Sequence, residues 1–172
     1  MESLSYILRL RNSLKDEYRN MPLFQNGSAL IVLNDKNEML LVERTDRDLW
    51  CLPGSLQELG ETFEEVAIRE LKEETGLMVA KNNLILIDVI SGESRKNIYP
   101  NGDQVYNNTV LYLIKKYEGE LNCNYSEIVD TGTNFVNKKE SKKLKFFDIN
   151  NLPTNLMDID LINRYKDYIN FN

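Results

Sequence analysis

The stretch ETFEEVAIRELKEETGL, residues 61–77, is the most informative part of this chain of 172 residues. Thr62 followed three residues later by Glu65 is a capping box, the usual start of a helix. Gly76 is a typical residue for the end of a helix, because glycine adopts the left-handed conformation without strain. These local signals predict a helix over residues 62–75.

Carboxylates share the apolar face of this predicted helix. At about 100° per residue, Glu70 and Glu74 fall within the apolar stripe, and Glu73 lies at its edge. The apolar members of the stripe are Phe63, Val66, Ala67 and Leu71. A solvated helix face explains Glu64, Glu65 and Lys72, but it does not explain the two carboxylates in the stripe. Burying an ionised carboxylate costs on the order of several kcal/mol, and a hard cation such as Mg²⁺ would offset that cost.

The same residues resemble the Nudix box. That motif has a Gly, five residues, a Glu, seven residues, and then Arg-Glu-apolar-x-Glu-Glu-x-Gly-apolar. Here Glu61 is followed by seven residues and then by RELKEETGL, residues 69–77. One position departs from the motif, because its first Gly falls on Ser55, directly after Gly54. If that position needs a positive φ, the serine would be strained. The box as a whole spans residues 54–77.

Outside the box, the sequence predicts an α+β arrangement of strands and helices without regular alternation. An apolar stripe at helical spacing predicts an N-terminal amphipathic helix over residues 3–19. Two apolar runs, residues 29–33 and 39–42, flank the turn sequence NDKN and predict a hairpin. Further strands are predicted over residues 50–52, 84–90, 104–114 and 144–147, a polar loop over residues 122–143, and a closing helix over residues 156–168.

The resemblance covers most of the chain. The segments LWCLPGS, YPNGDQVYN and KLKFFDINNLP are similar to those of a bacterial Nudix group described as ADP-ribose-pyrophosphatase-like. It implies one Nudix domain over residues 1–172, folded as an α/β/α sandwich around a mixed β-sheet. Residues 1–20 would form an added N-terminal helix, and residues 124–139 look like an insertion.

The resemblance also implies the chemistry, which is attack of water at a phosphorus of a diphosphate with Mg²⁺ as cofactor, for which Mn²⁺ could substitute. By similarity, Glu70, Glu73 and Glu74 are metal ligands, and the catalytic residues are Glu70, Glu73 and Arg69. The arginine would orient the carboxylates through charge-assisted hydrogen bonds. A further metal ligand from a later loop would be Glu140, with Glu127 as the alternative; a merely solvated Glu140 is an equal alternative.

Substrate contacts can be suggested from residue type and position. Arg44 and Arg47 could reach a phosphate, although both could equally be ordinary surface arginines. Gly54 and Ser55 begin the box and would approach the substrate with their backbone. Tyr106 could stack on a base, as could Trp50 and Tyr99, but aromatic residues of strands are also typical core residues.

Composition limits the function classes. The chain has no histidine, so acid–base chemistry would fall to carboxylates, Lys, Tyr or Cys. A net charge of −6 argues against a dedicated nucleic-acid or membrane-surface binder, and no apolar stretch is long enough to span a bilayer. Cys51 and Cys123 form no close-spaced pair and are expected to be reduced thiols of a cytoplasmic protein, with Cys51 in the core.

Four hypotheses of function follow. The first is a hydrolase of a nucleoside diphosphate linked to another moiety, with a small nucleotide as its partner. The others are a nucleoside triphosphate pyrophosphohydrolase, a nucleotide-sensing Nudix domain without hydrolysis, and an adaptor that binds proteins through the acidic helix. The apolar stripe of the N-terminal helix must be covered by its own sheet or by a second subunit, and a homodimer is the favoured expectation.

Overall fold

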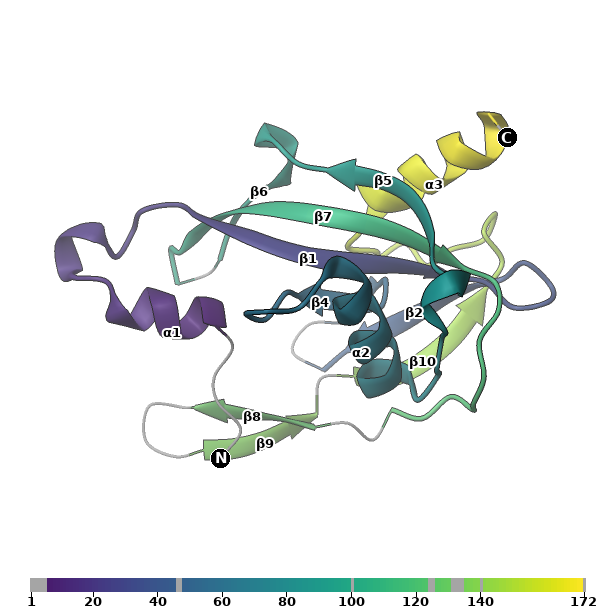
Figure 1. Ribbon diagram of the computed structural model, residues 1–172, viewed down its shortest axis with the longest axis horizontal. Helices are drawn as coiled ribbons and strands as arrows, with labels where there is room; N and C mark the ends of the chain where they lie inside the picture. Colours follow the sequence, from purple (N-terminus) through teal and green to yellow (C-terminus); the bar gives the residue numbers. More distant parts are fainter. Residues whose placement is uncertain are drawn as a thin grey trace.

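Two β-sheets and two long helices form the body of this chain in a computed structural model (Figure 1). The structure describes residues 6–45, 48–99, 101–123, 126–130, 135–139 and 141–171. The helices are α1 (Tyr6–Ser13), α2 (Phe63–Thr75) and α3 (Ile159–Phe171), with short 3₁₀ turns at Asp16–Tyr18, Lys81–Asn83 and Glu93–Arg95. The strands are β1 (Leu23–Val32), β2 (Met39–Arg44), β3 (Trp50–Cys51), β4 (Gly54–Leu56), β5 (Ile85–Ile90), β6 (Lys96–Ile98), β7 (Gln104–Ile114), β8 (Ser126–Asp130), β9 (Phe135–Lys139) and β10 (Ser141–Phe147).

The main sheet is mixed. Its strand order is β4-β1-β7-β5, and β6 pairs with the first part of β7. The two central strands, β1 and β7, run parallel, with Leu23 opposite Val105 and Val32 opposite Ile114. The other pairs of this sheet are antiparallel. A second, antiparallel sheet has the order β10-β2-β3. The prediction of an α+β fold with a mixed sheet is therefore confirmed.

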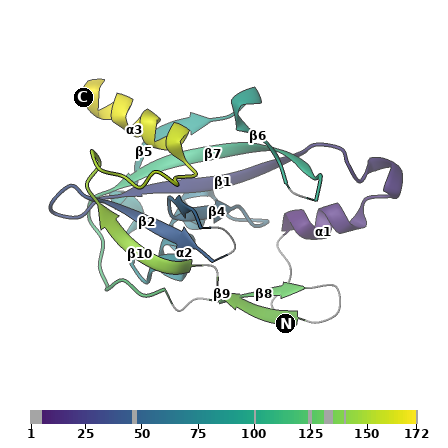
Figure 2. The ribbon, with the colours of Figure 1, turned by 180° about the vertical axis from the view of Figure 1, so that it is seen from behind.

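The two faces of the main sheet are covered by different helices (Figures 1 and 2). Alternate residues of a strand point to opposite faces, so β1 contributes to two cores. Ala29 and Ile31 pack with residues of α3, whereas Leu30 and Val32 pack with residues of α2. Burial on both sides explains why the apolar run of β1 is continuous rather than alternating.

The predicted hairpin of residues 29–33 and 39–42 is wrong, although its turn is right. Asn34 closes the turn, because its side chain accepts hydrogen bonds from the backbone N–H groups of Lys36 and Glu38. Asn37 takes a positive φ of 59° there. Beyond one bridge, the strands separate into different sheets. The physical reason is that β1 already has β4 and β7 as neighbours, so β2 pairs with β10 and β3 instead.

Several boundaries also differ from the sequence predictions. The polar segment 122–143 is not one long loop, because it contains the antiparallel pair β8–β9 and the start of β10. The segment before α2 includes the short strand β4, which pairs with β1. The closing helix begins at Ile159 and continues to Phe171. No helix in the described part of the chain is long and apolar enough to cross a bilayer.

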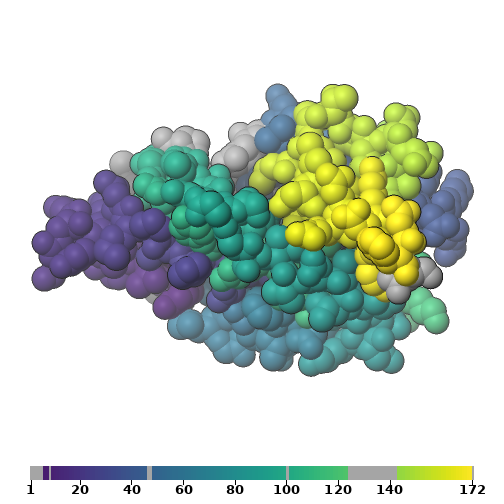
Figure 3. Space-filling model, turned by 90° about the horizontal axis from the view of Figure 1, so that it is seen from above, coloured from purple at the N-terminus to yellow at the C-terminus, as the bar shows by residue number. Residues whose placement is uncertain are grey.

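The N-terminal helix is shorter than predicted. Helix α1 ends at Ser13, and a single 3₁₀ turn follows before β1. It lies at one end of the molecule, far from α3 (Figure 3). The predicted stripe residues are partly buried; they are Tyr6, Ile7, Leu10 and Leu14. The homodimer stays a prediction.

Candidate active site

Helix α2 begins and ends where the sequence predicts. The hydroxyl of Thr62 accepts a hydrogen bond from the Glu65 N–H at 3.3 Å, and the Glu65 carboxylate accepts one from the Thr62 N–H at 2.7 Å. Gly76 ends the helix with a φ of 77°. Because both ends are held by local hydrogen bonds, the face that α2 presents to the sheet is fixed.

The carboxylates of the stripe are buried, as predicted. Glu70 and Glu74 are each only 6% exposed, and Glu73 is partly buried. Burial, opposed in part by the neighbouring Arg69 guanidinium, raises the pKa of Glu70 to about 7. A buried carboxylate whose charge is under-compensated is a group that a cation would stabilise.

Arg69 connects the carboxylates of this site. Its Nε and Nη2 donate to the two oxygens of Glu61 at 2.6 and 2.8 Å, a bidentate ion pair. Its Nη1 donates to Glu70 and, at 3.3 Å, to Glu73. Because of the pairing with Arg69, the pKa of Glu61 is lowered from its ordinary value. The orienting role that the resemblance implies for Arg69 agrees with this geometry and remains a proposal.

Glu74 is held from the other side of the site by the backbone of β4. Its carboxylate accepts a hydrogen bond from the Gly54 N–H at 2.8 Å. Gly54 has a φ of 138°, and a Cβ at this position would collide with the carbonyl oxygen of Ser28. Ser55 follows in the ordinary extended conformation of β4, so the missing box glycine causes no strain at this position.

The acidic groups fit a divalent cation by donor type. Mg²⁺ prefers carboxylate oxygens, and Glu70, Glu73 and Glu74 offer only such oxygens. Among the described residues, no three acidic, Cys or His side chains are gathered closely enough to hold a metal ion. In the arrangement observed, the positive charge at Glu70 and Glu73 comes from Arg69. The burial of Glu70, with a raised pKa despite that arginine, is the observation that fits an additional cation.

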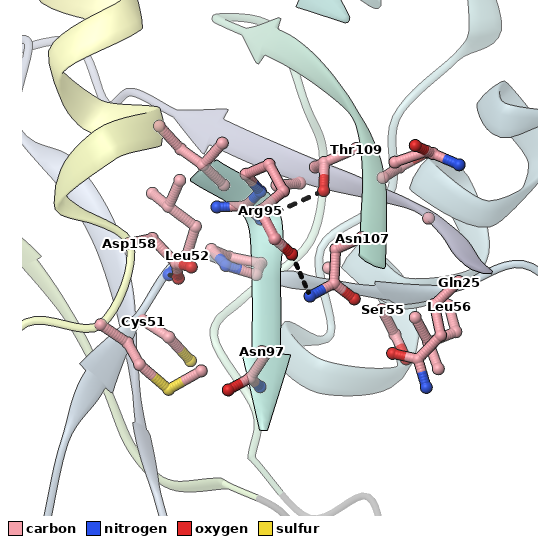
Figure 4. A pocket seen from close by; sticks show the side chains of 18 of the residues that line it. Gln25, Cys51, Leu52, Ser55, Leu56, Arg95, Asn97, Asn107, Thr109 and Asp158 are labelled. Atoms are coloured by element: carbon pink, nitrogen blue, oxygen red, sulfur yellow. Dashed lines mark hydrogen bonds between the residues drawn. The ribbon is translucent and has the colours of Figure 1, made fainter. Parts of the chain in front are cut away.

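A pocket of about 230 Å³ opens beside β4 (Figure 4). Its walls come from β1, β4, β6, β7 and the approach to α3. The polar lining includes Gln25, Ser28, Arg44, Ser55, Arg95, Asn97, Tyr99, Asn107, Thr109 and Asp158. Ligand pockets in proteins are commonly about 300–1,000 Å³, so this one would hold part of a nucleotide rather than the whole molecule.

Asp158 and Arg95 are the charged groups on the α3 side of this pocket (Figure 4). The Leu52 N–H donates to one oxygen of the Asp158 carboxylate at 3.0 Å, and burial raises the pKa of this carboxyl. The Arg95 guanidinium donates to Thr109 and pairs with Asp160 at 2.6 Å. Its Nε–H has no hydrogen-bond partner among the described residues.

The structure brings together some of the predicted substrate contacts. Gly54, Ser55 and Arg44 line the pocket, as does Tyr99, whose hydroxyl donates to Gln25.

Other predicted contacts lie elsewhere or outside the described residues. Tyr106 lies outside the pocket wall and packs on Phe24, with ring centroids 5.9 Å apart. Trp50 packs edge-on against Phe147, as a core residue. Cys51 is buried, as expected. Arg47 and Glu140 lie outside the described residues, and of Glu127 only its place in β8 is described.

Asp158, Arg95, Asn107 and Thr109 were not predicted from the sequence. They come from three separate segments, since Asn107 and Thr109 both lie in β7, and none belongs to a motif. The one local signal is that Asp158 directly precedes α3, a position where the short polar side chain of Asp is common for reasons unrelated to ligands.

Replacing Asp158 by Asn should change how stability depends on pH. Because burial raises the pKa of Asp158, the unfolded chain ionises this group at lower pH than the folded chain does. In the wild type, this group therefore contributes fully to the free energy of unfolding below the pKa of an unfolded Asp. That contribution is lost as the pH rises through the raised pKa of Asp158 in the folded protein. Asn does not titrate, and its amide oxygen can still accept from Leu52. The stability of Asp158→Asn relative to wild type should rise as the pH increases above about 4, the ordinary pKa range of Asp, measured by urea unfolding. A pH-independent difference would show that burial does not raise the pKa of Asp158.

Comparison with known proteins identifies the family. The model of the NUDIX domain matches residues 23–165, which includes the whole of α2 and the pocket. This chain belongs to the Nudix family. As a Nudix hydrolase, it has relatives named as pyrophosphatases and diphosphatases. It is 30% identical over 141 residues to an ADP-ribose pyrophosphatase of Methanocaldococcus jannaschii, covering 80% of this chain and 69% of that protein.

Two further comparisons agree with this family. A putative 8-oxo-dGTP diphosphatase of Bacillus subtilis is 47% identical over 58 residues, which are 34% of this chain and 39% of that protein. The crystal structure of a MutT Nudix hydrolase from Burkholderia pseudomallei superposes with a TM-score of 0.60 at 20% identity, over 82% of this chain and 97% of that one. At that identity the structural likeness shows the Nudix fold and not the substrate.

Proposed function

We propose that this Nudix protein is a divalent-metal-dependent hydrolase that cuts the pyrophosphate bond of a nucleoside diphosphate linked to another moiety. The observation that carries the proposal is the α2 face, where Glu70 and Glu74 are buried beside a sheet, next to a pocket of nucleobase size. A solvated face or a protein-docking helix gives no reason to bury these carboxylates. The similarity to an ADP-ribose pyrophosphatase over most of the chain favours a linked diphosphate as the substrate.

Each part of the site has a task in this proposal. Glu70, Glu73 and Glu74 would hold Mg²⁺ or Mn²⁺, which supplies charge neutralisation at the phosphate oxygens and acidifies an attacking water. Arg69 keeps Glu61, Glu70 and Glu73 in fixed relative positions. Because the chain has no histidine, a carboxylate, Glu70 or Glu73, would accept the proton of the attacking water.

The pocket would hold the nucleoside part of the substrate. It offers both an acceptor, Asp158, and a guanidinium with a spare N–H, Arg95, which suits the mixed donor and acceptor edge of a base. Arg44 lines the same pocket and could bind a phosphate. The net charge of −6 makes a small nucleotide a more suitable partner than a nucleic acid.

A product screen tests the function. Purified protein would be incubated with Mg²⁺ or Mn²⁺ and nucleoside diphosphate sugars, dinucleoside polyphosphates or nucleoside triphosphates, and the products separated by ion exchange. The proposal expects a nucleoside monophosphate and a phosphorylated second moiety from a diphosphate sugar, and no product in EDTA. Release of pyrophosphate from triphosphates alone would instead support the nucleoside triphosphate pyrophosphohydrolase; one relative, in Bacillus subtilis, is named a putative 8-oxo-dGTP diphosphatase. Binding without any product would support a sensor.

A further inference from the structure

The N-terminal segment lies outside the NUDIX match yet contacts the Nudix box. The match begins at Leu23, whereas α1 begins at Tyr6. Helix α1 lies beside the loop of residues 57–62, which joins β4 to α2 and is called the box loop below. The residues of α1 and the box loop that face one another include Tyr6, Ile7 and Glu58.

One end of α1 is fixed to the main sheet by Arg11. This side chain is buried, with 6% of the residue exposed, and its guanidinium donates to three backbone carbonyl oxygens. The acceptors are Arg19 and Met21, each at 2.7 Å, and Gln104 at 3.0 Å. Asp103 adds an ion pair at 3.6 Å. The helix is therefore attached to the start of β7, independently of the box loop.

The other end of α1 holds Glu58. The Tyr6 N–H donates to both oxygens of the Glu58 carboxylate, at 3.3 and 3.2 Å, and Arg9 lies 3.9 Å away. The box loop is also held at its two ends, where the Gln57 N–H donates to the Asn26 carbonyl oxygen at 2.8 Å and the Glu61 N–H donates to the Glu58 carbonyl oxygen at 3.2 Å. Leu59, between them, is 71% exposed. The contacts with Tyr6 and Arg9 therefore join the Glu58 side chain to α1, in addition to the hydrogen bonds within the loop.

From Glu58 a chain of hydrogen bonds continues to the carboxylates of α2. The Glu58 N–H donates to Glu61 Oε2 at 2.9 Å, and the same oxygen accepts from Arg69 Nη2 at 2.8 Å. Arg69 in turn donates to Glu70 and Glu73. The orientation of the Glu61 carboxylate, and with it that of Arg69, depends on where the backbone of Glu58 is held.

We propose that Glu58 is a positioning residue through which α1 orders the box loop, and thereby sets Glu61 and Arg69 against the carboxylates of α2. The N-terminal helix is then part of the active-site scaffold rather than an appendage. The consequence for catalysis rests on the proposed function, but the coupling itself can be measured without substrate.

The test compares Glu58→Ala with Glu58→Gln in the full chain. Groups that orient metal ligands typically contribute about 10–100-fold to metal affinity or activity, and we expect Glu58→Ala near the lower value, about tenfold in kcat and in Mn²⁺ affinity. KM for the nucleotide should change little, because the pocket does not include Glu58. Hydrogen exchange of the box-loop amides should become faster in the metal-free protein. Glu58→Gln keeps an oxygen that can accept from the Tyr6 N–H and should recover most of these losses.

Lys81→Ala is the matched control. It removes an exposed ion pair with Glu64 of α2, at 3.7 Å, without touching the box loop, and should leave kcat, Mn²⁺ affinity and hydrogen exchange unchanged. The proposal is overturned if Glu58→Ala speeds exchange only within α1 and leaves Mn²⁺ binding and the box loop at wild-type values, because Glu58 would then merely cap α1. It is also overturned if Glu58→Gln is as impaired as Glu58→Ala. If no nucleotide is hydrolysed at all, the proposed function fails, while exchange and Mn²⁺ binding still decide the coupling.

Discussion

Replacing Glu74 by Gln is expected to lower turnover by about three orders of magnitude, because a catalytic metal supplies several kcal/mol of transition-state stabilisation and each ~1.4 kcal/mol is tenfold in rate. Without metal, the variant should be as stable as wild type or more stable. In the wild type, the Gly54 N–H donates to the Glu74 carboxylate at 2.8 Å, and the amide oxygen of Gln can still accept this hydrogen bond. The change also removes a buried negative charge. The measurements are kcat with Mg²⁺ and urea unfolding in EDTA.

The matched control is Glu64→Gln on the same helix. Glu64 is paired with Lys81 near the surface and should tolerate the change with little effect on kcat or unfolding. The opposite responses of activity and stability in Glu74→Gln would be typical of a functional carboxylate. If Glu74→Gln instead unfolds the protein while its folded fraction keeps wild-type specific activity, Glu74 is a structural residue.

Replacing Arg69 by Ala is expected to damage both stability and activity. The change removes the cation shared by Glu61, Glu70 and Glu73 and leaves their carboxylates facing one another. We expect the metal-free protein to lose about 2 kcal/mol of unfolding free energy, discounted from the cost of breaking a fully buried pair because the Arg69 side chain is 28% exposed. Turnover should fall about 100-fold, as for other residues that orient metal ligands.

Arg69→Lys separates charge from geometry. Lysine keeps the positive charge but cannot make the bidentate contact with Glu61, so stability should recover more than turnover does. Adding Mn²⁺ should raise the melting temperature of Arg69→Ala more than that of wild type, because the ion would replace the lost positive charge. Equal stabilisation of both proteins would show that Arg69 and the metal do not share these carboxylates.

Local patterns predicted helix α2 well. The capping box of Thr62 and Glu65, the stop at Gly76 and the burial of Glu70 and Glu74 all follow from residues within one or two helical turns of each other. Such signals depend on neighbouring residues of the chain rather than on tertiary contacts, so they can be recognised in a single sequence. The family membership followed from the same stretch.

Features that depend on distant partners were not predicted. The strands of residues 29–33 and 39–42 look like a hairpin locally, yet β1 pairs with β7, whose residues lie far along the chain. Glu58 gains its partner from α1, and Asp158 gains its pocket from β6 and β7. Neither residue differs in type or spacing from an ordinary surface acid. Their roles arise from sheet order and helix placement, which periodicity does not encode.

Anomalous diffraction from crystals grown with Mn²⁺ and a non-hydrolysable ADP-ribose analogue tests the central claim most directly. The account predicts a manganese peak coordinated by Glu74 and by at least one of Glu70 and Glu73, through oxygen ligands only, with the diphosphate of the analogue beside it. A well-occupied analogue with no manganese at these carboxylates would contradict the account.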